Sequence, residues 1–158
     1  MFLASGWFSA IAGRAVTLIL FYNRPAHADL SELPEEDQRA FTSDLRLFDR
    51  ADAVTFHLPT LKPIASLAKP PGQLWILWSM ESVANYPAMA EPALLRSFDI
   101  IMTYERSADV WTPYMPDRRS WEAALRMPVP QKTAAAPAVM FQSSAFNRSG
   151  RIGYAAEL

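Results

Sequence analysis

Short apolar runs, separated by polar and proline-containing segments, most constrain what this chain can fold into. The clearest runs are rich in β-branched and aromatic residues and occupy residues 16–22, 53–57, 74–79 and 99–104. Apolar runs of this length between turn residues are typical of strands buried on both faces. The segments between them include helix-forming stretches at 45–50 and 91–97. We therefore expect an α/β fold with a mostly parallel sheet covered on both faces.

Composition excludes several classes of function. The 158 residues are 51% hydrophobic, which is enough for one modest core, and a formal charge of −1 gives no basis for nucleic-acid binding. The absence of cysteine excludes disulfides, thiolate metal sites and cysteine nucleophiles. The chain has only two histidines, which argues against a histidine-rich metal site. Only five glycines and no phosphate-binding glycine loop argue against an intact small nucleotide-binding protein.

The N-terminal residues have some features of an export signal. Residues 1–13 are apolar and rich in small side chains, and Ala26-His27-Ala28 resembles a signal-peptidase site. No positive segment precedes the apolar stretch, however, and Arg14 interrupts it. We therefore predict a ragged leader over residues 1–14 and a cytoplasmic protein, with peripheral attachment to an inner membrane left open.

The remaining chain divides by composition into three parts. Residues 15–127 contain the alternating strands and helices of one domain. Residues 128–137 hold prolines and an alanine triplet, which is typical of a linker. Residues 138–158 begin with a fresh apolar run and end in a helical pattern. We interpret that last segment as the first strand and helix start of a truncated second domain.

The apolar run at 74–79 leads directly to an acidic residue, Glu81. In open α/β sheets, ligands bind in the crevice beyond the carboxyl ends of the strands. Glu81 is therefore a candidate catalytic carboxylate, although a solvated loop residue or helix cap is the commoner outcome. Trp75 and Trp78 are three positions apart, so a strand directs them to opposite faces and at most one can line a cleft.

A series of short sequence blocks extends from about residue 15 to the end of the chain. The blocks are residues 41–44, 51–57, 78–82, 98–104, 109–114 and 141–151, together with Tyr154. In their order and spacing they resemble the N-terminal half of the bacterial α-1,3-fucosyltransferases, glycosyltransferase family 10. The resemblance implies the N-terminal, Rossmann-like domain of a two-domain GT-B fold, which faces the acceptor, while the C-terminal domain binds GDP-fucose.

The resemblance also implies a reaction and a set of site residues. Fucose passes with inversion from GDP-fucose, a donor substrate rather than a cofactor, to an N-acetylglucosamine-containing acceptor glycan. Glu81 would be the general base that takes the proton of the acceptor hydroxyl. The acceptor-binding candidates are His57, Trp78 and Tyr86. The candidates for the donor phosphates are Arg151, Asn147 and Ser144, and no metal is expected.

Other interpretations of these residues stay open at this point. His57 is equally well explained as a hydrogen-bonded strand-end histidine, and Arg151 as a surface arginine in the first turn of a helix. The chain also departs from the family pattern at Val83, Glu105 and Ser107.

Two hypotheses follow for the protein as a whole. Because the family's sugar-nucleotide signature lies beyond residue 158, we expect the chain alone to be weakly active or inactive. The alternative is a non-catalytic module, a pseudoenzyme that binds a glycan or a partner. Self-association through the exposed end of the chain, residues 138–158, is compatible with either hypothesis.

Overall fold

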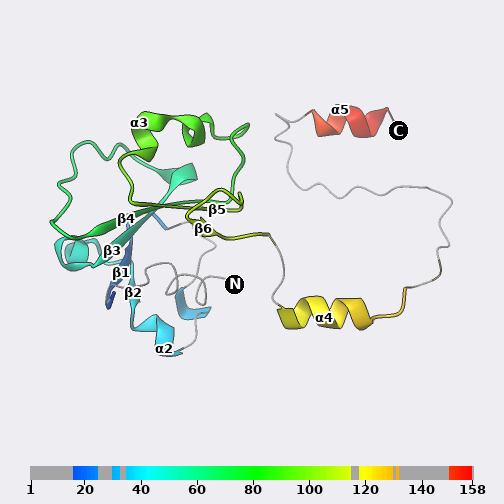
Figure 1. Cartoon of the computed structure of the whole chain (residues 1–158), viewed down its shortest axis with the longest axis horizontal. Helices are drawn as coiled ribbons and strands as arrows, with labels where there is room; N and C mark the ends of the chain where they lie inside the picture. The colour runs from blue at the N-terminus through cyan, green and yellow to red at the C-terminus, as the bar shows by residue number, and fades with distance from the viewer. Residues whose placement is uncertain are drawn as a thin grey trace. The chain divides into compact units, whose positions relative to one another are not determined.

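A computed structural model describes residues 16–24, 30–32, 35–114, 118–129, 131 and 150–157. The chain divides into two units, Met1–Met115 and Pro116–Leu158, which we describe separately. The described part of the first unit contains a sheet and its covering helices. The described part of the second unit contains two helices, α4 (Arg118–Arg126) and α5 (Arg151–Ala156) (Figure 1). The predicted domain boundaries stay predictions, because the predicted strand at 138–141 and most of the linker lie outside the described residues.

The first unit is built on a six-stranded sheet in which every neighbouring pair of strands is parallel. Its spatial order is β2-β1-β3-β4-β5-β6. The strands are β1 (Ile19–Phe21), β2 (Phe41–Thr42), β3 (Ala53–His57), β4 (Leu74–Ser79), β5 (Ile100–Thr103) and β6 (Val110–Trp111). The predicted α/β class with a parallel sheet is thereby confirmed.

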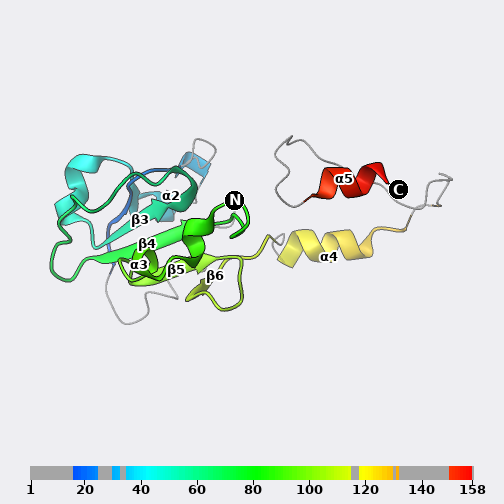
Figure 2. The same cartoon turned by 90° about the horizontal axis from the view of Figure 1, so that it is seen from above.

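Each face of the sheet carries its own hydrophobic cluster. One cluster contains Ile19, Ile76, Trp78 and Met102, and Leu30 and Ala40 near α2 (Glu35–Gln38) pack against it. The other contains Val54, Phe56, Trp75 and Leu77, and it is covered by residues of α3 (Pro92–Leu95). Figure 2 shows the first unit turned by 90°. As predicted, Trp75 and Trp78 lie on opposite faces.

The connections are shorter and tighter than the sequence suggests. The predicted helix at 45–50 is the 3-10 helix η2 (Leu45–Arg50), and the predicted helix at 91–97 is the single turn α3. Three further 3-10 turns are η1 (Leu30–Glu32), η3 (Leu58–Thr60) and η4 (Pro87–Ala90). Pro87, Pro92 and the proline of η3 lie in first turns, where the missing N–H costs nothing.

Strand β1 is also shorter than the predicted run at 16–22. The backbone N–H groups of Thr17 and Leu18 donate to the Asp52 carboxylate, at 2.8 and 2.9 Å, instead of to a neighbouring strand. The Thr17 hydroxyl donates to the same oxygen at 2.8 Å. Among the described residues, no helix has the length and apolar character needed to cross a membrane.

Candidate functional site

The carboxyl ends of all six strands meet at one edge of the sheet, because every strand is parallel to its neighbours. The order of the strands reverses between β1 and β3: the chain passes from β1 to β2 on one side, and then to β3 on the other. In α/β proteins, ligands bind beyond the carboxyl ends of the strands at a reversal of this kind. Asn23, after β1, and His57, at the end of β3, lie at this reversal.

Asn23 and His57 are joined at this reversal by two hydrogen bonds between the Asn23 side-chain amide and the His57 backbone. The Asn23 side-chain amide donates to the His57 carbonyl at 2.7 Å, and the His57 N–H donates to the Asn23 Oδ1 at 2.9 Å. The amide thus pairs with His57 as a further residue of strand β1 would. Thr60 adds a third group, because its Oγ1 lies 3.0 Å from both the Asn23 Nδ2 and the His57 Nδ1.

Trp78 lies directly beside His57. The two residues are register partners on β3 and β4, and their ring centroids are 5.2 Å apart. Trp78 is only 7% exposed, and its ring also packs edge-on against Phe21 at 6.3 Å. The indole therefore belongs to the core and supports the His57 ring. A direct contact between Trp78 and a sugar stays a prediction.

Glu81 lies at the start of the turn after β4 and is half-buried. Its backbone N–H donates to the Ser79 hydroxyl at 3.1 Å, and its carboxylate accepts a bond from the Asn85 amide at 3.2 Å. The turn is closed by the N–H groups of Asn85 and Tyr86, which both donate to the Ser82 carbonyl. Local hydrogen bonds therefore hold both the backbone and the carboxylate of Glu81.

The segment after β6 (Val110–Trp111) also contacts this turn. The Tyr114 hydroxyl donates to the Met80 carbonyl, and the Thr112 hydroxyl lies 3.3 Å from the Met80 sulfur. Partial burial of the phenol raises the pKa of Tyr114 above its ordinary value, and the negative charge of Glu81 raises it further. The charge of the Glu81 carboxylate therefore acts on the Tyr114 phenol.

Three strands end in the same short motif, in which a residue with a side-chain hydroxyl is followed two positions later by an acidic residue. The pairs are Thr42 with Asp44, Ser79 with Glu81, and Thr103 with Glu105. In each pair the hydroxyl oxygen accepts the N–H of the acidic residue, at 3.0–3.1 Å. This motif turns the chain where the strand ends, so each acidic residue lies just beyond the carboxyl end of its strand.

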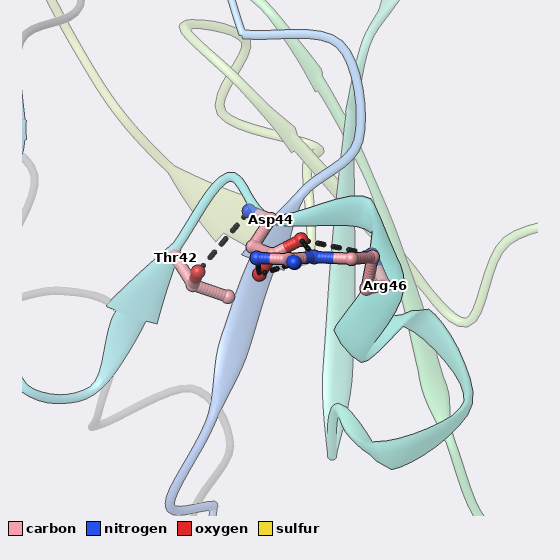
Figure 3. Close-up of polar contacts among 3 residues, drawn as sticks. All are labelled: Thr42, Asp44 and Arg46. Carbon is pink, nitrogen blue, oxygen red and sulfur yellow. Dashed lines mark hydrogen bonds and ion pairs between the residues drawn. The ribbon is translucent and has the colours of Figure 1, made fainter.

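At β2 this acidic residue is used structurally. Asp44 caps η2 by accepting the Arg46 N–H at 3.1 Å, and its carboxylate is paired with the Arg46 guanidinium at 2.7 Å (Figure 3). Hydrogen bonds from Arg46 hold the pKa of Asp44 below its ordinary value. The Asp44 carboxylate therefore serves as the N-cap of η2 and as the partner of Arg46.

The remaining predicted site residues are distributed as follows. Tyr86 packs against the cluster on the Trp75 face, so the structure does not bring it together with Trp78. Arg151 begins α5 in the second unit, directly after Gly150, whose φ is +73°. Ser144 and Asn147 lie outside the described residues. Their roles, like those of His57 and Arg151, stay predictions.

A groove of about 220 Å³ lies beside β5. Its polar side is formed by Thr103, Glu105, Ser107 and Asp109. Glu105 and Ser107, two of the positions at which the chain departs from the family pattern, thus line an open groove. Within the described residues, no group of three or more histidine, aspartate or glutamate side chains is arranged to hold a metal ion.

Sequence reasoning missed four residues of this edge: Asn23, Thr60, Asn85 and Tyr114. A usable signal existed for Asn23, since an asparagine directly after a buried strand and two residues before a proline is typical of a polar strand end. No local pattern identifies Thr60 or Tyr114. Thr60 is 37 positions from Asn23 and Tyr114 is 34 positions from Met80.

Comparison with known families now decides what this sheet belongs to. A family model described as "Fucosyltransferase, N-terminal" matches residues 14–115, which includes the whole sheet and Glu81. This chain belongs to the fucosyltransferases. The predicted resemblance to glycosyltransferase family 10 is therefore confirmed for the sheet-bearing part of the chain.

Individual relatives support the same assignment. A 4-galactosyl-N-acetylglucosaminide 3-alpha-L-fucosyltransferase (FUT5) of Hylobates lar is 33% identical over 116 residues, 66% of this chain and 30% of the relative. A 3-galactosyl-N-acetylglucosaminide 4-alpha-L-fucosyltransferase (FUT3) of Pan troglodytes is 31% identical over 112 residues, 64% of this chain and 30% of the relative. Alpha-(1,3)-fucosyltransferase 7 of Homo sapiens is 28% identical over 128 residues, 74% of this chain and 37% of the relative. The fucosyltransferase chain thus spans less than two fifths of each of these curated relatives.

Proposed function

We propose that this chain forms the acceptor side of an inverting α-1,3-fucosyltransferase. Fucose would pass from GDP-fucose to an N-acetylglucosamine-containing glycan bound at the carboxyl edge of the sheet. The observation that carries the proposal is the position of Glu81. It lies inside the segment matched to fucosyltransferases and two residues after the end of strand β4, at the sheet edge where α/β enzymes bind ligands.

In the proposed reaction, Glu81 takes the proton from the attacking hydroxyl of the acceptor. The hydroxyl oxygen forms the new bond to the anomeric carbon of fucose, and the bond to the GDP oxygen breaks on the opposite side. A sugar hydroxyl is a weak nucleophile, and a positioned carboxylate that accepts its proton supplies general-base catalysis. The Asn85 amide and the Ser79 hydroxyl support this role, because they hold the carboxylate and backbone of Glu81.

His57 is the proposed acceptor-binding residue next to Glu81. The two residues lie at the ends of adjacent strands, since β3 pairs with β4 and His57 is the register partner of Trp78. Arg151, with Ser144 and Asn147, is proposed for the diphosphate of the donor, where a guanidinium and a helix start suit negative charge. Because the chain spans only part of its relatives, we expect the 158 residues assayed alone to transfer fucose weakly or not at all.

Acceptor binding tests the proposal on the chain itself. An N-acetyllactosamine-type disaccharide is titrated into the ¹⁵N-labelled chain, with a glucose-only disaccharide as the control ligand. We expect concentration-dependent shifts that are confined to the strand ends, at His57, Glu81 and their neighbours. Shifts that are absent, or equal for the two sugars, would contradict the acceptor role.

Fucose transfer tests the catalytic part. The chain is assayed alone and as a fusion to the donor-binding half of a family member, with GDP-fucose and the same acceptor. Transfer by the fusion is the expected result. Acceptor binding by the chain without any transfer by the fusion would instead support the non-catalytic glycan-binding alternative.

A further inference from the structure

The peptide group that joins Met80 to Glu81 is hydrogen-bonded at both of its polar atoms. Its N–H donates to the Ser79 hydroxyl at 3.1 Å, and its carbonyl accepts a bond from the hydroxyl of Tyr114. A carbonyl can only accept and a backbone N–H can only donate, so the direction of both bonds is determined. Because the peptide group is planar, bonds at its two ends together restrict its rotation. This peptide therefore holds the point from which the Glu81 side chain extends.

The peptide group before Glu105 is bonded in the same way. The Glu105 N–H donates to the Thr103 hydroxyl at 3.0 Å. The Tyr104 carbonyl accepts a bond from the indole N–H of Trp111 at 2.9 Å. An indole N–H can only donate, so this bond also has one possible direction. After β4 and after β5, a hydroxyl of the strand thus binds one end of the peptide and an aromatic donor binds the other.

Both aromatic donors belong to one short segment, residues 111–114, which begins in β6. Its backbone is attached to the end of β5, because the Thr112 N–H donates to the carbonyl of the last β5 residue at 2.8 Å. Its side chains contact Met80 twice: the Thr112 hydroxyl lies 3.3 Å from the Met80 sulfur, and Tyr114 binds the Met80 carbonyl. The segment therefore connects the end of β5 to the turn that carries Glu81.

We propose that Tyr114 is a positioning residue for Glu81, which it orients through the carbonyl of the Met80–Glu81 peptide. The base in this statement rests on the proposed function, whereas the bonded peptide does not. Proton transfer requires the carboxylate to lie within hydrogen-bond distance of the acceptor hydroxyl, and a displacement of about 1 Å can lower the rate by about 100-fold. Loss of one of the two bonds should therefore lower kcat by about tenfold.

Tyr114→Phe tests the bond on the chain itself, because it removes the hydroxyl and keeps the ring that packs 5.7 Å from Tyr104. Tyr114 is 69% exposed, so the change leaves no buried cavity. Carbonyl ¹³C shifts and amide hydrogen exchange are measured by NMR. We expect Tyr114→Phe to shift the Met80 carbonyl and to speed exchange at the Glu81 amide by about tenfold.

Trp111→Phe is the matched control, since it removes the indole donor at the other peptide. It should shift the Tyr104 carbonyl and speed exchange at the Glu105 amide, with little effect at Glu81. A Met80 carbonyl that does not respond to Tyr114→Phe would overturn the inference. Equal responses of the two glutamate amides to both variants would also overturn it, because they would show a general change of structure.

Fucose transfer by the fusion with a donor-binding half tests the functional part. We expect Tyr114→Phe to lower kcat by about tenfold with little change in the KM for the acceptor, and Trp111→Phe to stay within about threefold of the unmodified protein. The double variant Tyr114→Phe/Glu81→Gln should be no slower than Glu81→Gln alone, because there is then no base to position. Losses that multiply in the double variant would show that Tyr114 acts independently of Glu81, and would overturn the positioning role.

The two sets of measurements separate this inference from the proposed function. If Glu81→Gln lowers transfer but Tyr114→Phe leaves kcat unchanged, the positioning role is wrong and the proposed function stands. If Glu81→Gln leaves transfer unchanged, the proposed function loses its base and the positioning role is overturned with it. In that case the NMR response of the Met80 carbonyl still shows whether Tyr114 holds the peptide.

Discussion

At the residue scale, one hydroxyl group at the end of a strand decides where the next carboxylate lies. Ser79 accepts the N–H of Glu81, and Thr103 accepts the N–H of Glu105 by the same geometry. The Glu81 carboxylate also accepts a hydrogen bond from the Asn85 side-chain amide at 3.2 Å. Glu105 instead lines the groove beside β5. The two glutamates therefore form a matched pair in which the motif is shared and the surroundings differ.

The proximity of Tyr114 to Glu81 gives the first prediction. Burial of the phenol, followed by the charge of Glu81, raises the pKa of Tyr114. In Glu81→Gln the pKa of Tyr114 should therefore fall toward its ordinary value, yet stay above it because burial remains. Spectrophotometric titration of tyrosine, with Tyr114→Phe to identify the signal, measures this change. A Tyr114 pKa that does not respond to Glu81→Gln would show that the two groups are not close.

Asp52 gives the second prediction, on stability. Partial burial acts to raise its pKa, but hydrogen bonds from Thr17 and Leu18 outweigh it, so the pKa of Asp52 is lowered on folding. A lowered pKa stabilises the fold above the unfolded value of about 3.9, and this contribution is lost as the pH falls through the folded pKa. Asp52→Asn should therefore lower the free energy of unfolding by about 1 kcal/mol at neutral pH.

Urea unfolding at a series of pH values checks this prediction. The difference between Asp52→Asn and the unmodified chain should shrink as the solution is made acidic. Asp49→Asn, which changes an exposed aspartate close by, is the control and should have little effect at any pH. A difference for Asp52→Asn that is constant with pH would contradict the charge-based explanation.

At the element scale, the central strands β3 and β4 determine most of the packing. Thr55 on β3 is 1% exposed, and its hydroxyl has no hydrogen-bond partner among the described residues. Thr103 on β5 is 2% exposed, but its hydroxyl accepts the Glu105 N–H. Two buried threonines thus differ in whether the hydroxyl is bonded.

This difference gives the third prediction. Thr55→Val replaces an unbonded buried hydroxyl with a methyl group and should raise the free energy of unfolding by about 1 kcal/mol. Thr103→Val removes a bonded hydroxyl and should lower it by a similar amount. Thermal and urea unfolding of both variants measure the two effects. Destabilisation by Thr55→Val would indicate that its hydroxyl is hydrogen-bonded in solution.

The central strands could be predicted to the residue, and the periphery could not. Residues 53–57 and 74–79 form strands over the predicted range because a continuous apolar run can be satisfied only inside the sheet. Strand β1 is shortened because the N–H groups of Thr17 and Leu18, which would extend it, donate to the Asp52 carboxylate instead. Asp52 is 35 positions from Thr17 and 34 from Leu18. The two-residue strand β6 was missed because so short a run carries no periodic signal.

The same distinction applies to the candidate site. Glu81 could be named from sequence because it follows a recognisable buried strand, and His57 because it matches a strand-end histidine of the family that the chain resembles. Asn23, Thr60 and Tyr114 could not be assigned roles, since their partners become neighbours only through the order of the strands. The spacing of Ser79 and Glu81, repeated at Thr103 and Glu105, was visible in the sequence. Only the structure shows that in each pair the hydroxyl accepts a hydrogen bond from the N–H of the glutamate.

At the scale of the whole molecule, this fucosyltransferase chain provides one sheet edge with two distinct parts. The part between β1 and β3 is a hydrogen-bonded network that contains Asn23, His57 and Thr60. The part after β4 presents a held carboxylate that suits proton transfer. We therefore propose that acceptor binding and general-base chemistry take place at adjacent strand ends. Among the acidic residues of this edge, Glu81 is the proposed base.

Fucose transfer by Glu81→Gln and Glu105→Gln, each in the fusion with a donor-binding half, tests this role of Glu81. We expect Glu81→Gln to lower kcat by about 100-fold to 10,000-fold, the usual contribution of general-base catalysis, with little change in the KM for the acceptor. Glu105→Gln, which has the same strand-end geometry, should keep kcat within about threefold of the unmodified protein, since it removes no catalytic group. A Glu81→Gln protein that transfers fucose as fast as the Glu105→Gln protein would contradict the assignment of Glu81 as the base.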